Sequence, residues 1–207
     1  MREISLYGLI PMKVTIKKED DAHLEFTLKD SSVAFANMVR RIGMGQVPVF
    51  AIQSVTVYEN RTSMFDEYIA HRIGLIPIST PPTYTEKDEI LFTLDSQGPC
   101  TVYSKDLKSF DDKVKVSNPN IPIIRLGEGQ NLRIEGKARL GTGREHARHQ
   151  PGLMSYSYDE KGNFEFKVES FSQISPREMV VRACEIAGKK CDGFLEALEE
   201  EKEKKEE

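Results

Sequence analysis

GNFEFKVESFSQISPREMVVRACEIAGKK, residues 162–190, joins a strand to a helix with almost no linker. The apolar residues of FEFKVES alternate with polar ones, which is the period of a strand with one buried face. Ser175 as N-cap, Pro176 at the first helical position and Glu178 predict the start of a helix. The apolar face of that helix consists of Met179, Val180, Ala183, Ile186 and Ala187.

This apolar face continues beyond Gly188 through Phe194, Leu195 and Leu198, so the sequence predicts one long helix that frays into a charged tail. From Met179 to Leu198 the face would span about 30 Å at about 1.5 Å per residue. A small sheet with one further helix cannot cover so much apolar surface, and the excess predicts a partner. The alternative is that the helix packs entirely on its own sheet.

The N-terminal part also predicts strands followed by a helix. KVTIKKEDDAHLEFTLKD, residues 13–30, predicts a hairpin around an acidic turn. Its single buried face would consist of Val14, Ile16, Leu24, Phe26 and Leu28. A helix follows, with Ser31 or Ser32 as N-cap and with Gly43 and Gly45 as its end. The apolar residues at helical spacing are Phe35, Met38, Val39 and Ile42.

Between Val47 and Tyr156 the pattern changes to short strands separated by turn residues, in VFAIQSVTVYE, ILFTLD, CTVYS and NLRIEGKARL. One helix interrupts them, and we expect Ser63 and Asp66 to form a carboxylate variant of the capping box at its start and Gly74 to end it. Phe65, Ile69 and Ile73 would line its buried face.

These elements predict an α+β protein. Residues 1–45 and 157–207 would form a discontinuous outer domain, an antiparallel sheet with two helices, and residues 46–156 would form a β-rich insert domain. No internal repeat or flexible linker is evident in the sequence.

Composition excludes several classes of protein. The formal net charge is −4, and the last twelve residues, with seven glutamates and three lysines, account for all of it. The rest of the chain is therefore neutral. This argues against a dedicated nucleic-acid-binding protein, because such a protein needs a positively charged surface. No stretch reaches the roughly 18 apolar residues of a membrane helix. We therefore expect a cytoplasmic protein that contacts neither a membrane nor, except indirectly, nucleic acid.

The three cysteines, Cys100, Cys184 and Cys191, are too few and too scattered for a disulfide framework or a Cys-only metal site. We expect free thiols, no metal and no cofactor.

GTGREHARHQPG, residues 141–152, is the stretch that most resembles an active site. His146 could be a catalytic base with Arg144 and Arg148 as anion-binding groups, or His146 and His149 could form a metal pair. Neither pattern is specific, since the zincin spacing and a third metal ligand are missing. The stretch is more typical of a structured loop that contacts a partner, and a plain loop is a further alternative.

Asn37, Arg40 and Arg41 share the helix face opposite the apolar one. Such a face is most often simply solvated. Two adjacent arginines with an asparagine are also suited to bind a carboxylate on another protein.

Four ordered motifs together resemble the D-type subunit family of archaeal RNA polymerase, which is related to the third-largest subunit of eukaryotic polymerase II and to the amino-terminal domain of the bacterial alpha subunit. The motifs are FANMVRRIGMGQVPVFAI, FDEYIAHRIGLIPI, GTGREHARHQP and FEFKVES with the following SPREMVVRA. The resemblance covers nearly the whole chain up to about Glu199.

The resemblance implies a split dimerisation domain whose helices pair with the smaller subunit L, as a platform for the large subunits and for the small subunits N and P. By the resemblance, the interface and its supporting core comprise Phe35, Met38, Val39, Ile42, Met179, Val180, Ala183, Ile186 and Leu198. It also implies that Asn37, Arg40 and Arg41 face the second-largest subunit, which is the B-type chain. The partner-contact loop would use Arg144, Glu145, His146 and Arg148. Catalysis would belong to a magnesium site on other chains.

Two departures from the family pattern bear on function. Many members carry a cysteine-rich domain with an iron–sulfur cluster, which needs closely spaced thiolates. Here Cys184 and Cys191 lie seven residues apart in a helical pattern, so no cluster is expected. His149 stands where the family commonly has an aromatic residue, so the loop's contacts can differ in detail. The rival interpretations are a hydrolase or transferase built on His146 and Arg144, and a nucleic-acid-binding module.

Overall fold

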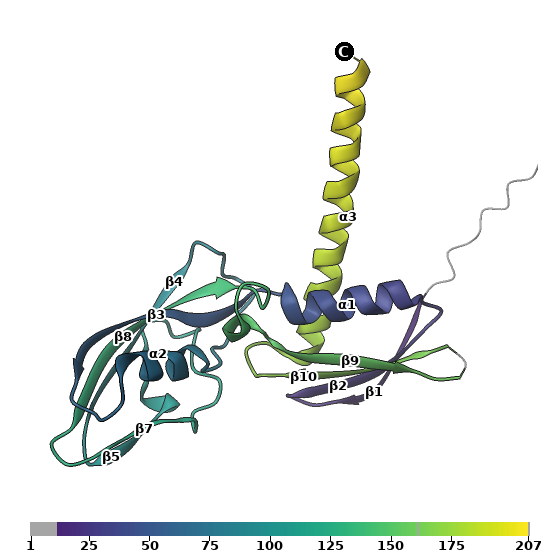
Figure 1. Cartoon of the computed structure of the whole chain (residues 1–207). Helices are drawn as coiled ribbons and strands as arrows, with labels where there is room; N and C mark the ends of the chain where they lie inside the picture. The colour runs from purple at the N-terminus through teal and green to yellow at the C-terminus, as the bar shows by residue number, and fades with distance from the viewer. Residues whose placement is uncertain (1–11, 161, 207) are drawn as a thin grey trace, which may run out of the picture.

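The computed structural model describes residues 12–160 and 162–206, so the first eleven residues of the predicted outer domain lie outside the described part. The chain forms an outer lobe and an insert lobe that lie side by side (Figure 1). The helix at the C-terminus rises away from the outer lobe and ends far from both bodies. No helix in the described ranges is long and apolar enough to cross a membrane.

The outer lobe has a four-stranded antiparallel sheet that is built from both ends of the chain. Its order is β1 (Lys13–Glu19), β2 (His23–Lys29), β10 (Phe164–Ser170) and β9 (Gly152–Tyr158). Backbone pairing between β2 and β10 joins segments that are far apart in the sequence. Because β9 begins at Gly152, the predicted boundary between residues 156 and 157 falls inside a strand.

Two helices lie on one face of this sheet, α1 (Val33–Gly45) and α3 (Pro176–Glu206). Ser32 is the N-cap of α1, and its Oγ accepts the amide of Phe35 at 3.2 Å. α1 continues through Gly43, which is buried against Met154 and Ala183; a Cβ there would lie 2.7 Å from Met154 Cε. Gly43 therefore allows close packing, and α1 ends at Gly45.

The outer core lies between these helices and the inner strands. Phe26 of β2 stacks on Phe166 of β10 with ring centroids 4.8 Å apart. The predicted burial of Val14 and Ile16 is wrong: their exposed fractions are 60% and 44%. Both lie on the same face as the core residues of β2, but β1 is the sheet edge, and the helices cover only the inner strands.

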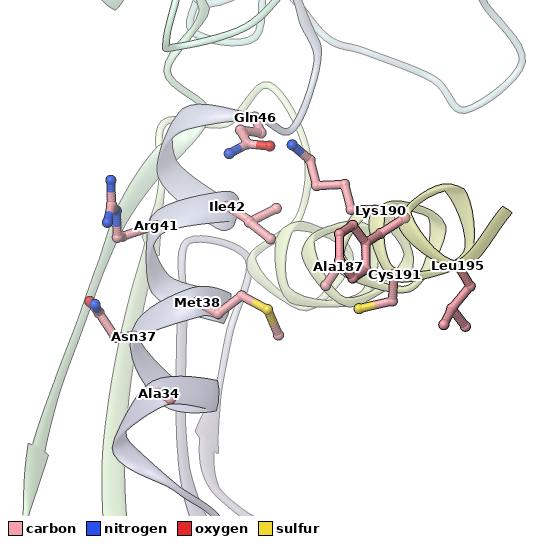
Figure 2. A pocket seen from close by; sticks show the side chains of 11 residues that line it. Ala34, Asn37, Met38, Arg41, Ile42, Gln46, Ala187, Lys190, Cys191 and Leu195 are labelled. Carbon is pink, nitrogen blue, oxygen red and sulfur yellow. The ribbon is translucent and has the colours of Figure 1, made fainter. Parts of the chain in front are cut away.

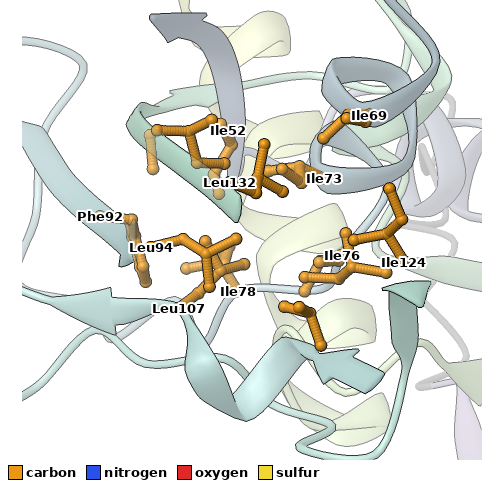
Figure 3. Packing of buried hydrophobic residues seen from close by; sticks show 14 of the residues in the cluster. Ile52, Ile69, Ile73, Ile76, Ile78, Phe92, Leu94, Leu107, Ile124 and Leu132 are labelled. Carbon is orange, nitrogen blue, oxygen red and sulfur yellow. The ribbon is translucent and has the colours of Figure 1, made fainter. Parts of the chain in front are cut away.

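The insert lobe contains a second antiparallel sheet, with the order β3 (Val49–Asn60), β8 (Asn131–Gly141), β4 (Glu89–Gln97) and β6 (Lys108–Ser109). A two-stranded sheet of β5 (Cys100–Tyr103) and β7 (Pro122–Leu126), a 3-10 turn η1 (Ser104–Asp106) and helix α2 (Asp66–Gly74) complete it. Isoleucines and leucines from these elements fill its core (Figure 3). The sequence did not indicate β6 or β7, which are short and poorly alternating.

The start of α2 differs from the prediction. Phe65 is its N-cap without a side-chain cap bond, and Asp66 is already helical, so the predicted capping box is wrong. Asn60 fixes this turn by donating from Nδ2 to the carbonyl of Met64 at 2.9 Å and to Asp66 Oδ1 at 2.6 Å. Ile69 and Ile73 are buried as predicted, whereas Phe65 is 72% exposed.

The two lobes meet around Thr80, which is buried. Its Oγ1 accepts the amide of Phe50, at the start of β3, at 2.9 Å. Its own amide donates to the carbonyl of Gln173 at 2.8 Å, and its carbonyl accepts from Arg182 of α3 at 3.5 Å. One threonine thus connects the insert sheet to α3 and to the loop that precedes α3.

Candidate docking surface on α1 and α3

A groove of about 710 Å³ lies between α1 and α3. Figure 2 shows that Met38 and Ile42 of α1 face Ala187 and Cys191 of α3 across it. Phe194 and Leu195 extend its apolar lining along α3. The groove is open and mainly apolar, which suits a docked protein surface better than a small polar substrate.

The apolar stripe of α3 continues past the body of the molecule. Phe194, Leu195 and Leu198 have exposed fractions of 64%, 58% and 53%. Figure 1 shows this half of α3 standing clear of both lobes. More than half of each of these three side chains is therefore open to solvent.

The residues implied for the interface and its core fall into groups by burial. Val39, Ile42, Met179 and Ala183 are buried in the chain's own outer core. Four others are half-buried and pack against that core: Phe35, Met38, Val180 and Ile186. Leu198 is exposed at the far end. The inner members therefore hold α1 and α3 in place, while Met38 and Leu198 belong to the surface.

The structure brings Asn37, Arg40 and Arg41 together on α1. Asn37 Oδ1 accepts from Arg40 Nε at 3.2 Å and from Arg40 Nη2 at 2.8 Å. Arg41 is exposed and lines the groove together with Asn37. The cluster presents guanidinium donors to solvent at the edge of the apolar groove, where a carboxylate could bind.

The loop between β8 and β9 is attached to its own chain through Arg148. Arg148 Nη1 donates to the carbonyls of Ile52 and Gln53 at 3.0 and 3.1 Å, and Nε donates to His146 Nδ1 at 3.2 Å. Arg148 lies within a 3-10 turn, η2 (Ala147–His149). Its guanidinium is therefore occupied inside the molecule, and it positions the loop.

Arg144, Glu145 and His146 are exposed on the same loop. The backbone amide of Arg144 donates to the carbonyl of Gly45 at 2.8 Å, which places the loop at the end of α1. Glu145 Oε2 accepts the amide of Thr142 at 3.1 Å. Within the described residues no group of three or more His, Cys, Asp or Glu side chains could hold a metal ion.

His149 is the loop residue whose role sequence reasoning missed. It is buried, with Nδ1 2.9 Å from the carbonyl oxygen of Val49. Burial lowers the pKa of His149 below its ordinary value. The residue that could have indicated this burial is Gly141. A Cβ at that position would come within 2.7 Å of His149 Nε2. The imidazole thus occupies space that only a glycine leaves free.

Comparisons with known proteins identify relatives of this chain. Residues 55–156 match the family model described as the RNA polymerase Rpb3/RpoA insert domain. The "DNA-directed RNA polymerase subunit Rpo3" of Methanocaldococcus jannaschii is 43% identical over 190 residues, covering 90% of this chain and 97% of the relative. The proteins of the same name from Pyrococcus furiosus and Thermococcus kodakarensis are 46% and 41% identical, and each match covers 72% of this chain.

The matches span 59% and 60% of the length of the last two relatives. The match to the M. jannaschii protein extends over nearly the full length of both chains, at an identity that shows common ancestry. It confirms the resemblance that the four sequence motifs indicated. The chain belongs to the family of archaeal DNA-directed RNA polymerase subunit Rpo3, which is the D-type subunit family.

Proposed function

We propose that this chain is a non-catalytic assembly platform of the archaeal polymerase, and that it pairs with the smaller subunit L through α1 and α3. The observation that carries the proposal is the apolar surface formed by the groove and by the exposed Phe194, Leu195 and Leu198. Stable protein interfaces bury about 800 Å² on each partner, and a long helix with an apolar stripe supplies area of that order. The discontinuous outer lobe would then be the dimerisation domain.

Other surfaces would receive the remaining subunits of the assembly. Asn37, Arg40 and Arg41 present the donors that a carboxylate of the second-largest polymerase chain would bind. On the loop, Arg144, Glu145 and His146 would contact a partner subunit, while Arg148 positions them from inside. The small subunits N and P would assemble on the same platform, and nucleic acid would be met only through the complete polymerase.

We propose that the chain is cytoplasmic and performs no catalysis itself. The catalytic magnesium site would lie on other subunits. We also propose that the chain holds no iron–sulfur cluster. Cys184 and Cys191 lie on one helix, and Cys100 is in the insert lobe. Loss of solvent around its thiol raises the pKa of Cys184, which disfavours the thiolate that a cluster needs.

Native mass spectrometry of the full chain, alone and coexpressed with the L subunit from the same genome, tests the pairing. We expect a 1:1 complex that replaces aggregates or weak homodimers, because the uncovered stripe is unfavourable in water. Phe194→Asp with Leu198→Asp should abolish the complex while the far-ultraviolet circular dichroism of the chain stays unchanged, since both residues are exposed. Glu196→Ala on the same exposed helix is the control. A wild-type monomer indifferent to L would contradict the proposal.

A further inference from the structure

A second pocket, of about 300 Å³, lies where the insert lobe meets the outer lobe. It shares no lining residue with the groove between α1 and α3. Three segments line it: the end of α2, the loop between β8 and β9, and the loop between β10 and α3. In that order, they contribute Leu75 and Pro77, Ala147 and Arg148, and Phe171 and Gln173. A group seated in this pocket would therefore contact both lobes.

The lining of this junction pocket is mainly apolar. Leu75 from the insert lobe and Phe171 from the outer lobe are large apolar residues with exposed fractions of 51% and 40%. The volume is far more than the roughly 30 Å³ that one water molecule occupies in the liquid, so a single water would leave most of the pocket unfilled. Open apolar walls of this kind suit the apolar body of an inserted group.

Gln173 is the buried polar residue of the junction pocket, with an exposed fraction of 5%. Its Nε2 donates to the carbonyl of Arg148 at 3.4 Å, and this bond sets the orientation of the side-chain amide. Within the described residues, Oε1 of the same amide accepts no hydrogen bond. A buried acceptor without a donor is unfavourable, so a group that fills the pocket is favoured if it brings a donor.

The charge of Arg148 restricts what that donor can be. Arg148 lines the pocket, and its guanidinium is held there by the carbonyls of Ile52 and Gln53. A lysine or arginine inserted beside it would bring two positive charges together, which is unfavourable at short distance. The donor should therefore be neutral. Tyrosine and tryptophan combine a large apolar ring with one neutral donor, and either ring could pack against Phe171.

We propose that the junction pocket receives a tyrosine or tryptophan side chain from another polymerase subunit, whose hydroxyl or indole N–H donates to Gln173 Oε1. The inference rests on the proposed function in one respect, because it takes the partner to be a subunit of the polymerase. It uses neither α1 nor the apolar stripe of α3. The inserted side chain would hold the two lobes in one relative position.

The chemistry of the pocket is tested with p-cresol and toluene, which share a methyl-substituted ring and differ by one hydroxyl donor. Nuclear magnetic resonance of the full chain, bound to L where that complex forms and alone otherwise, follows the methyl groups of Leu75 and Ala147 and the side-chain amide of Gln173. We expect p-cresol to bind about fivefold more tightly, although toluene is the more apolar ligand, since only p-cresol can donate to Oε1. Equal affinities, or no shift with either ligand, would overturn the inference.

Gln173→Leu should remove the preference, because the variant keeps the size of the side chain but lacks the acceptor. We expect p-cresol to bind it only as tightly as toluene, and toluene to bind as it does to wild type. The matched control is Gln97→Leu, at an exposed position of β4, which should retain the preference for p-cresol. If Gln173→Leu does not fold, the comparison of the two ligands on the wild-type chain still decides.

Cross-linking tests whether the natural occupant is a protein side chain. The photoreactive residue p-benzoylphenylalanine replaces Leu75 in a polymerase reconstituted from purified subunits, and mass spectrometry locates the cross-link. A cross-link to another subunit within a few residues of a tyrosine or tryptophan supports the inference, and a cross-link elsewhere or none overturns it. The same replacement at the exposed Tyr58, which does not line the pocket, should not label that segment. Failure to pair with L would be seen separately and would leave the ligand comparison valid.

Discussion

His149 shows how a single side chain can give the loop between β8 and β9 a structural role. Its ring is buried, and its Nδ1 lies 2.9 Å from the Val49 carbonyl oxygen, so the neutral imidazole donates a hydrogen bond there. His146 instead is exposed and accepts the Arg148 amide on Nδ1 at 3.1 Å. The two histidines therefore each use Nδ1 within their own chain, which favours a loop that holds structure together.

Stability should depend on pH through His149. Because burial lowers the pKa of His149 in the folded chain from 6.5, the unfolded chain takes up a proton first as the pH falls. The contribution of the neutral ring is complete above about pH 6.5 and is lost as the pH falls toward the folded-state pKa. For this one proton, the free energy of unfolding changes by at most about 1.4 kcal/mol per pH unit.

Urea unfolding of wild type and His149→Gln between pH 7.5 and about pH 5 measures this contribution. We expect the difference between the two free energies of unfolding to narrow as the pH falls, because a glutamine side chain cannot be protonated in this range. His146→Gln, at an exposed position, is the control and should follow the wild type. Parallel profiles for wild type and His149→Gln would show that the buried ring does not control the pH dependence.

Helix α3 is one continuous element with two different environments. Near its start, Met179 and Ala183 are buried in the outer core, whereas Phe194 and Leu198 are exposed. A continuous hydrogen-bonded helix transmits the direction set by its first turns to its exposed end. The N-terminal anchor of α3 therefore determines where its apolar stripe is presented.

Ser175→Ala should weaken that anchor. Ser175 Oγ accepts the amide of Glu178 at 3.2 Å, and the variant leaves this amide without its cap. We expect the free energy of unfolding to fall by about 1 kcal/mol, measured by urea titration. Ser157→Ala, at an exposed position of β9, should have little effect and is the control. An equal effect of both substitutions would argue against capping as the cause.

In the molecule as a whole, the orientation of the two lobes depends on a few buried contacts. β3 begins in the outer core with Val49 and continues into the insert core with Phe50 and Ile52. Thr80 adds hydrogen bonds to Phe50, Gln173 and Arg182. Any polymerase subunit that contacts both lobes would depend on this geometry.

Thr80→Val keeps the shape of the side chain but removes the acceptor for the Phe50 amide. A buried amide left without a partner costs about 1 to 3 kcal/mol, and we expect a loss of that size in urea unfolding. Hydrogen exchange should also accelerate at the start of β3. Thr80→Ser retains the hydroxyl and should preserve most of the protection, because the hydrogen bond remains. Equal hydrogen exchange at the start of β3 in Thr80→Val and wild type would mean that Thr80 does not stabilise the contact between the two lobes.

The amino-acid sequence alone was sufficient for the features that depend on neighbouring residues. Alternation identified Phe164 and Phe166 as one buried face. Local side-chain chemistry identified Ser175 as one helix cap and left Ser31 or Ser32 as the other, of which the folded chain uses Ser32. It also predicted that α3 carries more apolar surface than its own sheet covers, as the exposure of Leu198 shows. These signals are local because helix and strand periods repeat over a few residues.

Which of these faces is covered became apparent only in the folded chain. Val14 has the same alternation as Phe26, but it is exposed because β1 is the edge strand and the helices do not reach it. The sequence suggested Arg148 and His149 as possible site residues, but in the fold both side chains point toward β3. Arg148 donates to the carbonyl of Ile52. The ring of His149 lies near the carbonyl of Val49, in space that Gly141 leaves free. Burial depends on what packs from distant parts of the chain, and no local period contains that information.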